Sequence, residues 1–189
     1  MKKVNSTLFV LLILLSFNVG HTVLAQGKYI DKTGKIAFEA SEELFEPVKA
    51  KNESVTVILN TETAEIASLA LMKSFRFKNS LMEEHFNENY IESETYPKAT
   101  FKGKLLDFDL SELTTEEQDI EVDGKIELRG KEKQINTTLK MKISDDDAIV
   151  IKGAFFVKPE DFDIEIPSVV RNKIAKEIIV SLDFKLTKR

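Results

Sequence analysis

The chain contains no cysteine and no tryptophan. Without cysteine there is no disulfide to hold the fold together, so a hydrophobic core must supply its stability. This favours a large, closed and well-packed sheet over a small cross-linked scaffold. The same absence excludes a catalytic thiol and zinc sites built on cysteine.

Positive charge at the N-terminus is followed by an uninterrupted apolar run. Lys2 and Lys3 precede residues 8–15, which are all apolar, and Val23-Leu24-Ala25 ends the segment on a small residue. This order is typical of a secretory signal peptide. The run falls short of the ~20 apolar residues that a membrane-spanning helix needs. We therefore predict a signal peptide over residues 1–25, cleaved after Ala25, and a periplasmic or secreted domain over residues 26–189.

Cleavage after Ala25 changes the charge and the histidine content. Removing 25 of the 189 residues leaves 164, enough for one domain. Basic residues fall from 27 to 25 against 32 acidic ones, so the net charge changes from −5 to −7. An acidic surface repels phosphate backbones, which argues against nucleic acid as a partner. His85 becomes the single histidine, so haem held by two histidines of one chain is excluded. Haem or metal held by His85 across a dimer stays open.

Apolar and polar residues alternate along most of the remaining chain, and this period of two predicts β-strands. The clearest case places Ile178, Val180, Leu182, Phe184 and Leu186 on one face. About eight strands, without an internal repeat or a linker, favour one antiparallel barrel, because closure removes exposed strand edges. We predict an all-β fold, a single eight-stranded antiparallel barrel. Its strands are expected at residues 35–40, 53–59, 64–72, 99–107, 120–128, 133–143, 148–157 and 178–186, and the alternation recurs at 160–166.

The stretch 79–90 interrupts this pattern with helical spacing. Its apolar side is formed by Leu81, Met82, His85, Phe86 and Tyr90, opposite glutamates and asparagines. The spacing predicts one short amphipathic helix over residues 79–90. We expect it to lie across one mouth of the barrel, with Leu81, Met82 and Phe86 turned inward as a lid and His85 at the rim.

Three motifs occur in a fixed order along the chain. They are Tyr96-Pro97-Lys98-Ala99-Thr100-Phe101-Lys102-Gly103, then Gly124-Lys125-Ile126-Glu127-Leu128-Arg129-Gly130, then Glu160-Asp161-Phe162-Asp163-Ile164. Together they resemble the YceI-like family of lipocalin-like barrels, which are periplasmic or secreted and include binders of polyisoprenoid lipids. The segment before the helix departs from the family pattern: the usual Arg-Asp-x-His-Leu is replaced by a stretch that keeps a histidine, His85, and lacks the Arg-Asp pair.

The resemblance implies an exported, non-catalytic carrier for a long apolar ligand such as an isoprenoid, a quinone or a fatty amide. The composition of 13 Phe, 3 Tyr and no Trp suits a dry tunnel, and it suits a packed core equally well.

No cofactor and no metal is predicted. Asp145-Asp146-Asp147 lacks the ligand spacing of a calcium loop and reads as a turn. The predicted cavity residues are Phe38, Val57, Phe75, Phe77, Leu81, Met82, Phe86, Phe101, Ile126, Leu139, Phe155, Val180 and Phe184, with His85 at the rim.

Two other functions are compatible with the sequence. An enzyme could use His85 with Glu83 or Glu84, but neighbours one or two positions apart on a helix point in different directions, and no nucleophile motif stands nearby. A protein with a packed core could instead act through its surface, as an interaction or stress-related module without a ligand. A homodimer is compatible with any of these functions.

Overall fold

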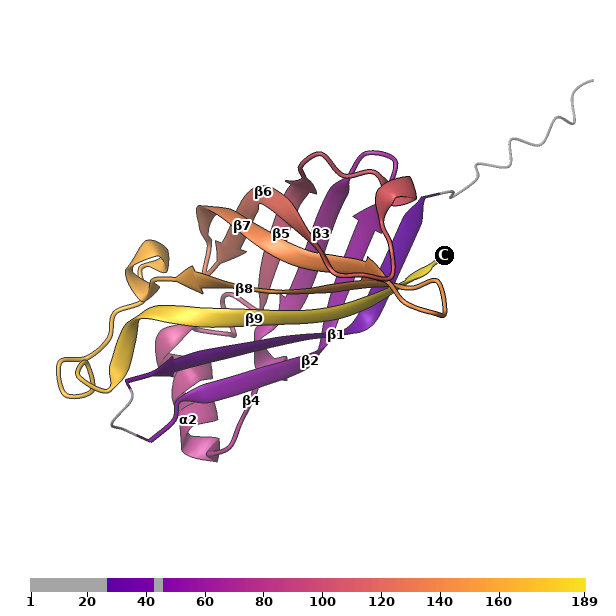
Figure 1. The fold of residues 1–189 in the computed structure, drawn as a ribbon. Coiled ribbons are helices and arrows are strands. Elements are labelled where there is room, and N and C mark those ends of the chain that lie inside the picture. The colour runs from indigo at the N-terminus through magenta and orange to yellow at the C-terminus, as the bar shows by residue number, and fades with distance from the viewer. Residues whose placement is uncertain (1–26, 43–45) are drawn as a thin grey trace, which may run out of the picture.

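The computed structural model describes residues 27–42 and 46–189, so the predicted signal peptide lies outside the described residues. Strands account for most of them, as Figure 1 shows. The strands are β1 (Lys28–Ser41), β2 (Lys49–Asn60), β3 (Glu65–Leu71), β4 (Arg76–Phe77), β5 (Lys98–Leu105), β6 (Gln118–Leu128), β7 (Lys131–Ile143), β8 (Ile149–Val157) and β9 (Ile174–Lys188). The helical elements are α2 (Ser80–His85), the π-helical turn η3 (Phe86–Tyr90) and the 3₁₀ turns η2 (Met72–Ser74), η4 (Leu110–Glu112) and η5 (Pro159–Phe162).

Eight of these strands close into an antiparallel barrel. The order around the wall is β1-β9-β8-β7-β6-β5-β3-β2, and β2 pairs with β1 to complete the circle. The two-residue strand β4 adds to β2 alone, where Arg76 faces Lys51. The prediction of an eight-stranded barrel with one short helix is therefore confirmed.

The two ends of the barrel differ in how they are filled. At the end where β2 turns into β3, inward side chains pack into a core whose members are fully buried, among them Val55, Leu59, Leu105, Met141 and Leu186. At the opposite end, α2 and residues 158–173 lie over the mouth (Figure 1). Inward side chains therefore fill the barrel at the β2–β3 end. In the half nearer α2, which we call the upper half, they line its inner wall.

Residues 160–166 do not form a strand, although their alternation resembles one. Pro159 begins a 3₁₀ turn there, since proline lacks the N–H group that a central strand needs. Asp163 then adopts a left-handed conformation with φ of 53°, which ends the turn. The alternation still has a structural effect: Phe162 is buried, and Ile164 and Ile166 face the interior of the barrel.

The described part of the chain contains no helix long and apolar enough to cross a membrane.

Candidate functional site: an apolar cavity under a helical lid

A cavity of about 480 Å³ occupies the upper half of the barrel. All eight barrel strands contribute to its wall, together with the helical segment and residues 158–173. Its size falls within the range of small-molecule sites in proteins. The wall is predominantly aliphatic and aromatic, and the few polar residues that line it include Ser68 and Thr137. Such a cavity can hold an apolar molecule and exclude water from it.

Twelve of the thirteen predicted cavity residues lie on this wall. They come from every part of the barrel and from the helical segment, because inward positions of distant strands converge on one space. They are Phe38, Val57, Phe75, Phe77, Met82, Phe86, Phe101, Ile126, Leu139, Phe155, Val180 and Phe184. Contact of these side chains with a ligand stays a prediction.

Leu81 is the exception, and its predicted inward position is wrong. Its side chain is 54% exposed and does not reach the cavity. The inward stripe of the helical segment runs through Met82, Phe86 and Tyr90, each four residues after the last. Leu81 precedes that stripe by one position and is rotated out of it by about 100°. His85, predicted at the rim, is exposed and still borders the cavity.

Four phenylalanine rings gather beneath the lid. Phe86 on η3 lies with its ring centroid 5.4 Å from Phe38, 5.8 Å from Phe75 and 5.1 Å from Phe77. Phe38 in turn lies 5.6 Å from Phe75 and 5.7 Å from Phe77. These separations are those of favourable aromatic pairs. The cluster attaches the helical segment to β1 and β4 and forms an aromatic wall of the cavity.

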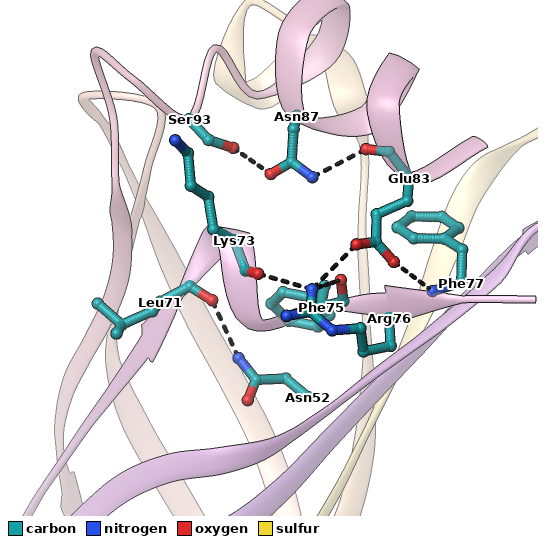
Figure 2. A network of polar contacts seen from close by, with 9 residues as sticks. All are labelled: Asn52, Leu71, Lys73, Phe75, Arg76, Phe77, Glu83, Asn87 and Ser93. Atoms are coloured by element: carbon teal, nitrogen blue, oxygen red, sulfur yellow. Dashed lines mark hydrogen bonds and ion pairs between the residues drawn. The ribbon is translucent and has the colours of Figure 1, made fainter. Parts of the chain in front are cut away.

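Polar contacts secure the same segment from its outer side, as Figure 2 shows. The Asn79 side chain caps α2 by accepting from the N–H of Leu81. One oxygen of Glu83 accepts from Arg76 Nη1 at 3.0 Å, and the other accepts from the Phe77 N–H at 3.1 Å. Arg76 also donates to the carbonyl of Lys73 at 2.8 Å. Glu83 therefore joins the helix to β4 and holds the lid over the mouth.

Two buried polar residues form hydrogen bonds on either side of residues 72–90 (Figure 2). Ser93 donates to Asn87 at 2.6 Å, and Asn87 donates to the carbonyl of Glu83 at 2.8 Å. Asn52 is completely buried in β2 and donates to the carbonyl of Leu71 at 3.0 Å, just before η2. Both buried side chains therefore have partners, and they fix the chain at the end of the helical segment and just before η2.

Charged side chains surround the cavity where it meets solvent. Glu46, Lys158 and Lys173 border it, and Lys158 lies 3.5 Å from Glu177. His85 stands at the same rim, but both oxygens of Glu83 are occupied by Arg76 and Phe77. The geometry therefore gives His85 no carboxylate from Glu83 of the kind that a general base requires.

A second cluster of charges connects the lid to the barrel wall. Arg129, at the turn between β6 and β7, bonds both Glu92 and the carbonyl of Asp163. Lys131 Nζ lies 2.7 Å from Asp163 Oδ2, and Lys133 Nζ lies 2.7 Å from Asp161 Oδ1. The hydrogen bond from Lys131 lowers the pKa of Asp163, and the positive charge of Lys131 adds to the effect. Residues 158–163 are thus fastened to β7 by ion pairs.

Several cavity residues were missed by sequence reasoning. Most are smaller residues on strands already predicted, such as Ile36, Ile66, Ala70 and Ala99, and the alternation around Phe38 and Phe101 could have identified them. Most of the others come from residues 158–174, which include Phe162, Ile164, Ile166, Val170 and Ile174. The alternation at 160–166 indicated an inward face, but nothing in it showed that these residues fold over the mouth.

The fold resembles several solved structures. A polyisoprenoid-binding domain from Saccharophagus degradans, implicated in plant cell wall breakdown, superposes with a TM-score of 0.73 at 17% identity, over 86% of this chain and 99% of that one. BcnA from Burkholderia cenocepacia gives a TM-score of 0.67 at 13% identity, over 82% and 96%. The YCEI protein of Campylobacter jejuni gives 0.61 at 14% identity, over 77% and 88%. At these identities, the likeness shows a common barrel fold.

Sequence comparison gives the family directly. No curated protein matches the chain significantly. The YceI-like domain, in contrast, matches residues 15–186, which is nearly the whole chain. Given this match and the closed barrel, the chain belongs to the YceI-like family.

Proposed function

We propose that this protein binds a long apolar, lipid-like molecule inside its barrel and carries or sequesters it outside the cytoplasm without chemical change. The observation that supports this most strongly is the cavity of about 480 Å³, enclosed by strands and lined by apolar side chains. A packed core of the same size would leave no such space. The ligand class that suits this wall is an isoprenoid, a quinone or a fatty amide.

One structure of the same fold supports the same ligand class. The Saccharophagus degradans domain with the same fold is described as polyisoprenoid binding. An isoprenoid chain is flexible and wholly apolar, so it suits a wall of phenylalanine, isoleucine and leucine side chains. The burial of apolar surface would supply the affinity, at roughly 25 cal/mol for each Å² removed from water.

Native mass spectrometry of the protein purified from its own cells tests the binding. We expect an additional mass that is released by organic solvent and identified as an apolar lipid. Protein that is always empty, together with failure to bind any added lipid, would contradict the proposal and favour a module that acts through its surface.

Export is tested by the N-terminus of the same sample. The predicted cleavage after Ala25 gives a mature chain that begins at Gln26, which N-terminal sequencing detects. An intact Met1 on protein recovered from the cytoplasm would contradict the export, while the lipid-binding measurement stands independently.

Substitution of His85 separates a carrier from an enzyme. His85→Ala should leave the retained lipid and its chemical structure unchanged, because the histidine only borders the cavity. Conversion of a lipid by the native protein that disappears in His85→Ala would support catalysis instead.

A further inference from the structure

The wall of the barrel is incomplete between β7 and β8. These strands pair only from Leu139–Gly153 to Ile143–Ile149, although β7 begins at Lys131 and β8 continues to Val157. On their other sides, the two strands are paired over this part as well. β7 pairs with β6 as far as Lys131, and β8 pairs with β9 as far as Val157. In Figure 1, β7 and β8 diverge toward the end of the barrel where η5 lies.

A separate pocket of about 370 Å³ occupies this gap. It shares four wall residues with the large cavity, namely Ile135, Thr137, Phe155 and Val157. The gap therefore adjoins the cavity along the inward faces of both strands. A ligand whose chain fills the barrel could place one end there without leaving the protein.

The gap differs from the cavity in its chemistry. Each strand residue carries one N–H donor and one carbonyl acceptor, and those along the diverging edges of β7 and β8 have no ladder partner across the gap. One side chain already uses such a group, because Thr137 Oγ1 donates to the carbonyl of Ala154 at 3.3 Å. Phe156 adds an aromatic ring that is 60% exposed. Gln134 and Asn136 also line the gap, but the Gln134 amide donates to Asp123 on β6, so the strand backbones supply the free hydrogen-bonding groups.

The gap also carries no uncompensated charge. The two charged residues that line it, Lys133 and Asp161, are paired with each other at 2.7 Å. The mouth under the lid has more charged side chains, since Glu46, Lys158 and Lys173 border it, although Lys158 is paired with Glu177. A charged head group would find no partner in the gap, whereas an uncharged group that both donates and accepts hydrogen bonds would match its two strand edges.

We propose that the gap between β7 and β8 is the head-group site of the ligand, and that it takes an uncharged, hydrogen-bonding head such as an amide or a hydroxyl. This rests on the proposed function, because it assumes that the cavity holds an apolar chain. It makes the barrel a site for molecules with a long apolar chain and a neutral polar end, bound with that end in the side wall.

Photolabelling with two isomeric probes tests this assignment on the native protein. One probe is hexadecanamide with a diazirine on its amide substituent, and the other carries the diazirine near the end of the chain. After irradiation, adducts are located by tandem mass spectrometry. The matched control is an excess of plain hexadecanamide, which should suppress both labels.

The head probe should label residues 133–137 and 154–157 about tenfold more than residues 85–90 and 166–174, because a polar head without hydrogen-bond partners is disfavoured by about that factor. The chain probe should instead label cavity residues outside these ranges, such as Phe38, Phe101 and Phe184. Head-probe adducts concentrated at residues 85–90 or 166–174 would overturn the head-group site and leave lipid binding intact. No suppressible label from either probe would overturn the lipid-binding function itself.

Discussion

The ring of Phe86 stacks on the ring of Phe38, with centroids 5.4 Å apart and an angle of 29° between their planes. One ring belongs to the helical segment and the other to β1. This contact joins the lid to β1, close to the point where β4 pairs with β2, because Phe38 and Phe77 both pair with Ala50. Both rings also line the cavity, so the same contact closes the mouth and forms part of the cavity wall.

Phe86→Ala should weaken both the fold and the binding of an apolar ligand. Removal of a core phenylalanine typically costs 3–5 kcal/mol, and for this partly buried ring we expect about 2 kcal/mol. Leu81→Ala on the same helix is the matched control and should change stability by no more than about 0.5 kcal/mol, since that side chain is exposed. Denaturant unfolding measures both variants. Equal losses would show that Leu81 is packed inward after all.

Glu83→Gln should loosen the lid without unfolding the barrel. The change removes the charge that Arg76 faces at 3.0 Å and weakens the bond from the Phe77 N–H. Because the pair is partly exposed, we expect a loss of about 1 kcal/mol. Hydrogen exchange of the Phe77 amide should accelerate. Glu84→Gln is the control, as its side chain is exposed, and faster exchange in that variant would argue against a specific role for Glu83.

The ion pair between Lys131 and Asp163 predicts a dependence on acid pH. Lys131 lowers the pKa of Asp163 in the folded state. A carboxyl group with a lowered folded pKa stabilises the fold above its unfolded pKa and loses that contribution as the pH falls through its folded pKa. Lys131→Met should therefore raise the pKa of Asp163 toward its usual range, as a carbon-detected NMR titration of the carboxyl group would show.

Lys133→Met is the control for this titration, because Lys133 pairs with Asp161 and not with Asp163. The pKa of Asp163 should stay low in that variant. A shift of equal size in both variants would mean that the general positive charge of β7 governs Asp163, and that its contact with Lys131 has no special role.

Gly124→Ala should distort the cavity wall. Gly124 faces Gly103 across β5 and β6, and the ring of Phe101 lies against both. A Cβ atom on Gly124 would stand 2.5 Å from Phe101 Cζ and 2.6 Å from the backbone of Gly103, so the ring and the strand must both move. We expect a loss of roughly 1–3 kcal/mol and weaker lipid binding. Gly153→Ala should cost less, because its Cβ meets the flexible end of Leu139. The reverse order would contradict this role of Phe101.

The barrel could be predicted from the sequence because inward and outward residues alternate strictly on most strands. On β9, Ile178, Val180, Leu182 and Phe184 all reach the cavity, as their spacing indicated. On β1, only residues 35–40 were predicted, yet the strand begins at Lys28. Its first half contains Asp31, a buried carboxylate that accepts from the N–H of Thr33 at 2.7 Å and of Lys185 at 2.9 Å.

The features missed by sequence reasoning depend on tertiary structure. The alternation of β1 is broken by register shifts between Asp31 and Gly34, where a charged residue turns inward because partners from β9 satisfy it. The gap between β7 and β8 could not be predicted from the sequence, because apolar and polar residues continue to alternate on both strands beyond their last paired residues. Local patterns identify inward faces, but they do not show which strands separate or which loops fold over the mouth.

Titration of the protein with all-trans-retinol, an isoprenoid alcohol whose fluorescence rises in an apolar site, tests the central claim most directly. Two adjacent residues of β3 provide matched variants: Ser68 faces the cavity, and Ala67 does not line it. We expect the delipidated native protein and Ala67→Phe to bind one retinol each, and Ser68→Phe to lose binding because its ring occupies the cavity. Equal binding by Ser68→Phe and Ala67→Phe would place the ligand outside the barrel and contradict the account.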